Sequence, residues 1–506
     1  MGVEMLTRRR FLAATGAGVL GLAGWRFWPD QGFWNDCASV ALPPALAQHS
    51  LMARVWQGID PAQLWDCHVH LLGRGDAASG AWINPRMDSL WHPVERLQKA
   101  FYLNAACVED VAGMDAVFVE RLLMQHQAFP KGSKLMLLAF DWHHDTGGQR
   151  VEDFSPFHTP NEYAQRVARA YPDHFEWIAS VHPYRKDAVH ALQAAAQGGA
   201  RAVKWLPAAQ GMDPADARCD QFYEALARLK LPLLTHAGHE LAVQGGQMQD
   251  YGNPLRLRRA LDHGVRVIVA HCASLGDGID LDRGPDGPAV SNFKLFARLM
   301  DEPRYAKLLY GDLAAVGQRL RVGEALHTLI TRREWQARLV YGSDYPLPGV
   351  MPIFSPRTLA ADGFLKQEEA AFLSELRRTN PLLFDFALKR LFAVDGQGFD
   401  TAVFASRRVF TGDKWGLYCG ETYAALFAML IAPPRVGNRT PNVLRALSGL
   451  NQGRRAGTKN HDFRKGRLPL IGLPQPLIRP PLSPQETILG RPQTPRSPLI
   501  QSTPRR

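Results

Sequence analysis

The chain has 506 residues, of which 46% are hydrophobic and 21% charged, a composition typical of a globular protein with a sizeable core. The formal net charge of +11 is concentrated in residues 431–506, where twelve Arg and two Lys face only Asp462 and Glu486. The rest of the chain therefore sums to about −1. A folded part this close to neutral gives no support for a DNA- or RNA-binding domain.

Residues 1–47 are predicted to be an export segment and linker. The string from Thr7 to Leu12 contains consecutive arginines and is followed by a small, apolar run from Ala13 to Trp25. This pattern resembles a twin-arginine export signal, and the run is too short and too Gly-rich for a spanning helix. Ala45-Leu46-Ala47 is a candidate cleavage site; an uncleaved N-terminal anchor is the alternative, because this site lies far from the run. We expect the twin-arginine export machinery as a partner and a periplasmic location.

Short apolar runs alternate with helix-length segments between residues 60 and 395. The runs are Leu64–Leu72, Lys134–Trp142, Glu176–His182, Ala200–Leu206, Leu231–His236, Val265–His271, Lys307–Leu313 and Arg338–Ser343. They are rich in Val, Ile and Leu without strict alternation, as parallel strands buried on both faces are. Helical patterns begin at Asn161, Asp220 and Pro254. The sequence thus predicts an α/β fold, a (β/α)8 TIM barrel over residues 48–395, with a doubly wound sheet as the alternative.

Beyond residue 395 the alternating pattern fades. Residues 396–432 are predicted to be a weakly structured extension with one helix from Glu421 to Leu430. Pro, Arg, Gly and Ser dominate residues 433–506, which predicts a disordered basic tail without a packed core. A contact with acidic lipid or another polyanion, and a reading-frame artefact, are the alternatives for this tail.

Six cysteines lie far apart at positions 37, 67, 107, 219, 272 and 419, and no CxxC spacing occurs. We expect them to be mainly buried thiols rather than disulfides.

His68 and His70 lie two residues apart at the end of the first predicted strand. Side chains alternate along a strand, so both imidazoles are expected to point into the barrel while Cys67 and Val69 point away. Two imidazoles on one face can hold one cation, and imidazole suits Zn, Mn or Fe. An isolated HxH string is a weak signal, but here later strands supply further ligand-type residues.

His236 and His271 end the fifth and sixth predicted strands, and Asp344 follows the eighth. Active sites of barrels form at the carboxyl ends of their strands, so these side chains are expected to meet His68 and His70 there. Asp344 is predicted to be both a metal ligand and a general base, and a turn carboxylate before Pro346 is the alternative.

Lys204 ends the fourth predicted strand, where a buried lysine is costly unless it is paired or modified. Three interpretations stay open: a carbamate that bridges two metals, a cation that binds substrate, and a rim lysine that reaches solvent.

With these strings the chain resembles the amidohydrolase superfamily, in particular the amidohydrolase 2 branch, over about residues 60–395. The resemblance rests on Asp66-Cys67-His68-Val69-His70, Gly199 to Lys204, Thr235-His236-Ala237-Gly238, Ala270-His271, Gly342 to Pro346 and Arg378 to Pro381. It implies His68, His70 and His236 as metal ligands. It implies His271 as a ligand of a second metal or a contact to the reacting carbonyl, and Asp344 as ligand and proton shuttle.

Loops after the strands are expected to set specificity. Arg185 is a candidate carboxylate clamp, with a solvated surface arginine as the alternative, and His143 can face either substrate or solvent.

We therefore expect a metal-dependent hydrolase that cleaves an amide, ester or lactone by metal-activated water, with Asp344 and His271 as the catalytic residues. Zinc is the expected metal, with Mn or Fe as alternatives and one or two ions per site. The alternative function is a lyase, a decarboxylase or hydratase of an aromatic or unsaturated carboxylic acid. A non-catalytic periplasmic metal-binding protein is a third hypothesis. The expected partner is a small-molecule substrate, and homo-oligomerisation stays open.

Overall fold

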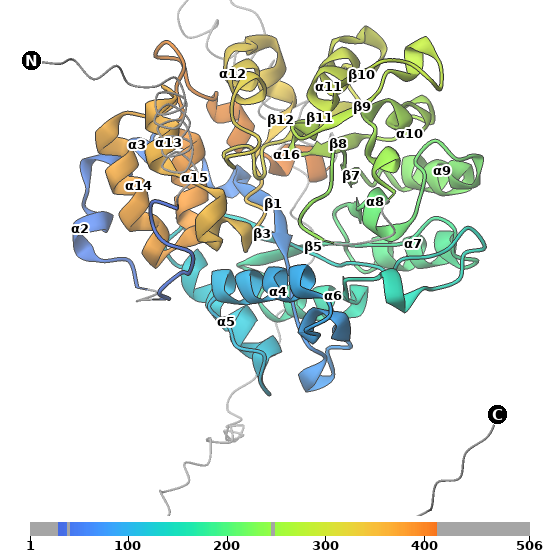
Figure 1. Ribbon diagram of the computed structural model, residues 1–506, viewed down its shortest axis with the longest axis horizontal. Helices are drawn as coiled ribbons and strands as arrows, with labels where there is room; N and C mark the ends of the chain where they lie inside the picture. Colours follow the sequence, from blue (N-terminus) through green and yellow to red (C-terminus); the bar gives the residue numbers. More distant parts are fainter. Residues whose placement is uncertain (1–28, 38–40, 244–247, 412–506) are drawn as a thin grey trace, which may run out of the picture. The chain divides into compact units, whose positions relative to one another are not determined.

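The computed structural model describes residues 29–37, 41–243 and 248–411 (Figure 1). The predicted export signal up to residue 28, the predicted helix over 421–430 and the predicted basic tail lie outside the described residues. Within these three ranges, no helix has both the length and the apolar character needed to cross a bilayer.

Eight parallel strands follow one another around a barrel, and each coincides with one of the eight predicted runs. They are β1 (Trp65–His70), β3 (Lys134–Leu138), β5 (Phe175–Ile178), β6 (Val203–Trp205), β7 (Leu233–His236), β8 (Val267–Ala270), β11 (Leu309–Asp312) and β12 (Leu339–Val340). Two ladders, β1-β3-β5 and β6-β7-β8-β11-β12, account for six of the contacts between neighbouring strands. Parallel bridges from Ala179 to Val203 and from Val69 to Tyr345 join the two ladders at both ends and close the ring.

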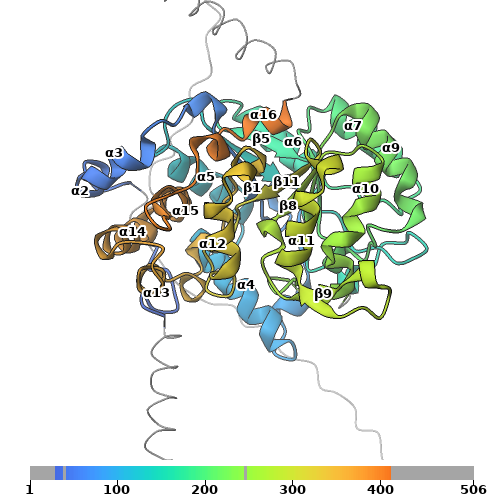
Figure 2. The ribbon, with the colours of Figure 1, turned by 90° about the horizontal axis from the view of Figure 1, so that it is seen from above.

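Helices surround the strands, and α3, α14 and α15 lie together in both views (Figures 1 and 2). The helices are α2 (Pro44–Ala47), α3 (Ser50–Trp56), α4 (Pro93–Ala106), α5 (Met114–His126), α6 (Asn161–Ala170), α7 (Ala188–Gln197), α8 (Pro207–Gln210), α9 (Asp220–Leu229), α10 (Arg258–Asp262), α11 (Asn292–Asp301), α12 (Glu324–Thr331), α13 (Pro356–Ala361), α14 (Gln367–Thr379), α15 (Pro381–Leu391) and α16 (Arg407–Phe410). Short antiparallel pairs, β2 (Trp82–Ile83) with β4 (Phe157–His158) and β9 (Asp277–Ile279) with β10 (Ala289–Ser291), lie in the loops. The predicted helices at Asn161, Asp220 and Pro254 correspond to α6, α9 and a 3-10 turn that leads into α10.

The barrel interior is a separate apolar cluster to which every strand region contributes. Its buried members are Trp65, Cys67, Met136, Leu138, Ile178, Ala202, Leu234, Ile268, Ala270 and Val340, together with Val409 and Phe410, and the partly buried Tyr310 of β11 packs against them. Val69 belongs instead to the larger cluster that includes the helices. The prediction that Cys67 points away from the interior is therefore wrong. The β1–β3 register shifts between Asp66 and Val69, and such a bulge changes the face to which the following side chains point.

Two segments outside the predicted barrel boundaries pack against it. Ser406 bonds to Trp65, and Tyr341 N donates to Val403 O at 3.1 Å, so the packing continues beyond residue 395 as far as α16. Near the other end of the described chain, Gln31 Nε2 donates to Ser374 O of α14 at 2.7 Å.

Cys37 and Cys107 form a disulfide, with their Cα atoms 5.5 Å apart, so the prediction of mainly buried thiols is wrong for this pair. This disulfide attaches the segment before α2 to the C-terminal end of α4. Cys67, Cys219 and Cys272 are buried free thiols, as expected.

Candidate metal centre

His68, His70 and Asp344 form a group whose ligand atoms all lie within 4.8 Å of one another. Oδ1 of Asp344 lies 3.3 Å from Nε2 of His68 and 3.2 Å from Nε2 of His70. The backbone brings the two strands together, because Asp344 N donates a hydrogen bond of 2.8 Å to His68 O. Two imidazole nitrogens and a carboxylate oxygen are a donor set that divalent Zn, Mn or Fe accepts, so these residues fit a metal ion.

The carboxylate of Asp66 links the two strand ends that carry these ligands. Its Oδ1 accepts hydrogen bonds from His68 N at 3.1 Å and from Ser343 N at 2.9 Å. Since Asp66 is buried, this shared oxygen fixes the backbone on either side of the site.

Asp312, at the end of β11, orients His68 from behind. Its Oδ2 lies 2.6 Å from Nδ1 of His68, and both side chains are buried. A carboxylate on Nδ1 keeps the proton there and leaves Nε2 free to bind a cation. Gly342 makes room for this pair, because a Cβ at position 342 would lie 2.5 Å from Asp312 Oδ1 and 2.8 Å from His68 Cβ.

His236, at the end of β7, is buried beside the same group. Its Nε2 lies 3.2 Å from Oε2 of Glu240, yet neither ring nitrogen has a hydrogen-bond partner of acceptable geometry among the described residues. A buried imidazole with unsatisfied nitrogens is costly unless a ligand completes it. The unsatisfied nitrogens of His236 are therefore a second, independent indication that the centre holds a metal ion.

His271 follows β8 and contacts the opposite oxygen of Asp344. Its Nε2 lies 3.8 Å from Oδ2 of Asp344, and its Nδ1 lies 2.9 Å from Ala314 O. Both His271 (φ 56°) and Asp344 (φ 64°) have left-handed backbones, which cost about 1–2 kcal/mol each for residues with a side chain. Strain of this kind gathers at functional sites, where the surrounding structure enforces it.

Lys204, from β6, is also part of the centre. Its Nζ lies 3.1 Å from Nε2 of His68, and the residue is 2% exposed. Burial lowers the pKa of Lys204, although the charges of Asp312, Asp344 and Glu240 oppose that shift.

Protonation states at the centre favour cation binding. Burial lowers the pKa values of His68, His236 and His271 well below that of ordinary histidine. Burial works against ionisation of Asp344, but its neighbouring imidazoles outweigh that effect and hold the pKa of Asp344 well below its usual range. Neutral imidazoles and an ionised carboxylate are the forms that ligate divalent metals.

A narrow pocket of about 70 Å³ opens onto this centre. Apolar and aromatic side chains form most of its remaining wall: Leu72, Tyr102, Phe157, Leu206, Val243 and Leu347. The hydroxyl of Tyr102 donates to Ala242 O, which connects α4 to the loop after β7. The wall therefore offers an apolar surface facing a charged centre.

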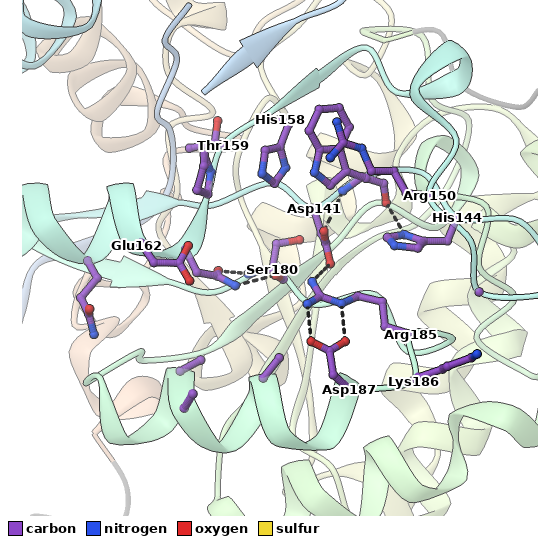
Figure 3. Close-up of a pocket in the computed structure, with 18 of the residues that line it drawn as sticks. Asp141, His144, Arg150, His158, Thr159, Glu162, Ser180, Arg185, Lys186 and Asp187 are labelled. Atoms are coloured by element: carbon purple, nitrogen blue, oxygen red, sulfur yellow. Dashed lines mark hydrogen bonds and ion pairs between the residues drawn. The ribbon is translucent and has the colours of Figure 1, made fainter. Parts of the chain in front are cut away.

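Arg185 and His143, the other predicted substrate residues, do not line this pocket. Arg185 lines a separate pocket of about 680 Å³, where it binds Asp141 at 2.9 Å and Asp187 at 2.8 Å (Figure 3). His143 is buried, with Nδ1 2.8 Å from Ala209 O. The structure thus brings together His68, His70, Lys204, His236, His271 and Asp344, but not Arg185 or His143.

Three further residues at or beside the centre were not predicted: Asp312, Tyr102 and Arg321. Asp312 ends β11 and lies one residue before the end of the predicted run Lys307–Leu313, so its position near a predicted strand end was a usable signal. Glu240 lies in the loop after the fifth predicted strand, one of the loops expected to set specificity, and its Oε2 lies 3.2 Å from Nε2 of His236. Tyr102 and Arg321 come from elements whose approach to the centre only the fold reveals.

The family described as Amidohydrolase matches residues 65–371. The chain belongs to the amidohydrolase 2 family. The matched range runs from β1 into α14 and includes every residue of the His68–His70–Asp344 group. This amidohydrolase is a metal-dependent enzyme with a divalent metal site at those residues. No curated protein matches its sequence.

Solved structures similar to this amidohydrolase include an uncharacterised TIM-barrel protein from Bordetella bronchiseptica. The two sequences are 18% identical, the match covers 64% of this chain and 99% of that chain, and the TM-score is 0.37. A 4-oxalomesaconate hydratase from Rhodopseudomonas palustris shares 17% identity over 64% of this chain and 98% of its own, with a TM-score of 0.34. A 5-carboxyvanillate decarboxylase from Novosphingobium aromaticivorans, complexed with manganese and 4-hydroxy-3-methoxy-5-nitrobenzoic acid, shares 12% identity with this chain. The match covers 71% of this chain and 97% of that chain, with a TM-score of 0.37. At these values the likeness does not extend to activity.

Proposed function

We propose that this amidohydrolase 2 protein is a metal-dependent lyase, a decarboxylase or hydratase, that acts on a small unsaturated or aromatic carboxylic acid. One observation carries the proposal: Lys204 and Arg321 are buried cations near the metal centre, and neither has a carboxylate within ion-pair distance among the described residues. A divalent ion would add to this positive charge, and burial raises the pKa values of Asp66, Asp312 and Glu240, so these carboxylates offset the charge only in part. A buried surplus of this kind is costly until an anion neutralises it.

The reaction expected first from the sequence, hydrolysis of an amide, ester or lactone, becomes the second candidate. Such substrates are neutral at the bond that reacts and do not call for two additional cations. The pairing of Asp344 with His70 and His271 still supports hydrolysis, because a carboxylate beside a metal site can accept a proton from water. The decarboxylase and the hydratase among the similar solved structures add no weight, since their TM-scores are low.

Different residues of the centre would have different roles in this reaction. Lys204 is placed to hold a carboxylate next to His68, and the apolar wall that includes Phe157 and Leu206 is placed to hold the carbon skeleton and exclude water. Asp344, ionised at rest, would accept a proton and return it, with His271 Nε2 3.8 Å from its Oδ2. A divalent ion on His68, His70 and Asp344, joined by His236, would supply a Lewis acid that stabilises negative charge on substrate oxygens.

The test is a comparison of two substrate panels on protein reconstituted with Mn²⁺ or Zn²⁺. We expect metal-dependent release of carbon dioxide from, or hydration of, at least one aromatic or unsaturated acid, and loss of that activity with a chelator. Asp344→Asn should retain bound metal through the three imidazoles and lose most turnover. Conversion of esters, lactones or amides, without conversion of any acid, would replace this proposal with the hydrolase.

We also propose that the protein is exported. The support is the arginine pair before the apolar run, together with the Cys37–Cys107 disulfide, because disulfides persist mainly in oxidising compartments. Cell fractionation of the full chain and of its Arg8→Lys/Arg9→Lys variant tests this. Equal distribution of the two proteins between compartments would contradict it.

A further inference from the structure

Glu240 is a buried carboxylate in the wall of the pocket that opens onto the metal centre. It lies in the loop after β7. Its Oε1 accepts two hydrogen bonds from its own loop, from Ala242 N at 2.6 Å and from Val243 N at 3.1 Å. Its Oε2 accepts none from the described residues, and a buried carboxylate oxygen without a donor is costly. Oε2 is therefore the atom of this side chain for which the described fold supplies no partner.

His236 lies next to Oε2 and has the same deficit. Nε2 of His236 lies 3.2 Å from Oε2 of Glu240, but the two atoms do not have the geometry of a hydrogen bond. Both ring nitrogens of His236 are buried without a hydrogen-bond partner among the described residues. Two unsatisfied polar atoms that lie this close without bonding to each other are both free to bind a third atom.

The distance between these two atoms matches the spacing of ligand atoms around one ion. Two ligand atoms that each lie about 2.1 Å from a shared ion are about 3.0–3.4 Å apart at ordinary coordination angles. Oδ1 of Asp344 lies 3.3 Å from Nε2 of His68 and 3.2 Å from Nε2 of His70. The 3.2 Å between His236 and Glu240 repeats that spacing.

One narrow space joins this pair to the rest of the centre. His68, His70, His236, Glu240 and Asp344 all line the same pocket of about 70 Å³. A space of this size holds only a few water molecules. The nitrogen and oxygen donors on its wall therefore surround one small volume, and an ion held there by the imidazoles would be within reach of Oε2.

We infer that Glu240 is a further ligand of the metal ion at the centre, bound through Oε2 beside Nε2 of His236. The donor set then comprises the imidazoles of His68, His70 and His236 and the carboxylates of Asp344 and Glu240. Glu240 lies outside the ligand set that the family resemblance implies. The inference rests on the metal ion of the proposed function, but not on whether the reaction is that of a lyase or a hydrolase.

A second carboxylate changes which metal the centre prefers. Imidazole suits Zn²⁺ and Fe²⁺, whereas carboxylate oxygens suit Mn²⁺ and Mg²⁺. Glu240 therefore reduces the advantage that a site made mainly of imidazoles gives to Zn²⁺ over Mn²⁺. A residue that only shaped the loop after β7 would affect the binding of both ions alike.

Competition with a fluorescent chelator measures the affinities of the full chain for Mn²⁺ and Zn²⁺. Glu240→Gln is the deciding variant, because its amide oxygen can still accept from Ala242 N and Val243 N while an NH2 group replaces Oε2. We expect this variant to bind Mn²⁺ about tenfold or more weakly than the wild type, with a smaller loss for Zn²⁺.

Gln249→Leu is the matched control. It removes the two hydrogen bonds that the side chain of Gln249 makes with the backbone of Glu240, and it leaves the carboxylate in place. This variant should keep the wild-type ratio of the Mn²⁺ and Zn²⁺ affinities.

Equal Mn²⁺ affinities in the wild type and Glu240→Gln would overturn the inference, and so would a loss by the same factor for both ions. Should Glu240→Gln not fold, a crystal structure of the Mn²⁺-loaded wild type decides. Oε2 should lie about 2.2 Å from the ion, and an ion coordinated by the other donors without Glu240 would overturn the inference. Failure of the proposed reaction reads out separately, because neither measurement needs turnover. A protein whose Mn²⁺ affinity depends on Glu240 but that converts no acid keeps this ligand and loses the lyase assignment.

Discussion

Oδ2 of Asp312 lies 2.6 Å from Nδ1 of His68, so a residue outside the ligand group determines which nitrogen of a ligand faces the metal. We expect Asp312→Asn to weaken metal affinity about 10- to 100-fold, because an amide can present its NH2 group to Nδ1 and favour the wrong tautomer. Competition with a fluorescent chelator measures the affinity. Asp286→Asn, on the exposed loop between β9 and β10, is the matched control. Equal affinities in the two variants would show that Asp312 does not orient His68.

Gly342 provides a second test of the same geometry without altering any polar group. Gly342→Ala should lower metal affinity, because the new methyl group would overlap both Asp312 and the Cβ of His68. Metal content after dialysis against a dilute chelator measures the effect. Gly363→Ala, where a Cβ meets nothing within 4 Å although φ is 85°, controls for a general loss of stability. A Gly342→Ala protein that retains metal as the wild type does would mean that the centre adapts to the extra methyl group.

Glu176 joins three strand regions of the barrel. It accepts from Lys134 Nζ at 2.7 Å and from Arg201 Nε at 2.8 Å. Burial opposes its ionisation, but these hydrogen bonds outweigh burial and hold the pKa of Glu176 below its usual value of 4.5. A carboxyl whose pKa is depressed by folding stabilises the protein above the unfolded-state value and loses that effect as pH falls through the folded-state value.

We therefore expect Glu176→Gln to reduce the free energy of unfolding by about 1–2 kcal/mol at pH 7. The difference from wild type should persist down to about pH 4.5 and shrink below it. Urea unfolding across this pH range measures it, with the exposed Glu224→Gln as the control. A difference that grows on acidification would refute this role for Glu176.

The disulfide between Cys37 and Cys107 closes a loop with a sequence separation of 70 residues. Cross-links over loops of this size typically stabilise proteins by about 2–4 kcal/mol, so a reductant should lower the unfolding free energy of the wild type by that order. The Cys37→Ser/Cys107→Ser protein should be less stable from the start and should not respond to the reductant. If the reductant lowered the unfolding free energy of both proteins equally, the Cys37–Cys107 disulfide would not be the cause of the loss.

The eight strands were predictable because strands buried on both faces are mostly apolar without strict alternation, and Val267–Ala270 is a clear case. His68, His70 and Asp344 were predictable because ligand-type residues directly follow or end such runs. The side to which Cys67 points was not, since a bulge depends on how two strands pair and leaves no mark in the composition. Arg321 and the partner of Cys37 were out of reach for a similar reason: their significance comes from neighbours that are distant in the chain.

The ring has a seam where its first and last strands meet, and the metal ligands lie on both sides of it. β1 and β12 share no continuous ladder; Val69 and Tyr345 form an isolated bridge, and Asp344 N bonds to His68 O. A folding chain in which β1 has formed and β12 has not yet docked presents the imidazoles of His68 and His70 but not the carboxylate of Asp344. All three residues can therefore coordinate an ion only after the last strand has docked. The bound ion then stabilises the contact between the first and last strands.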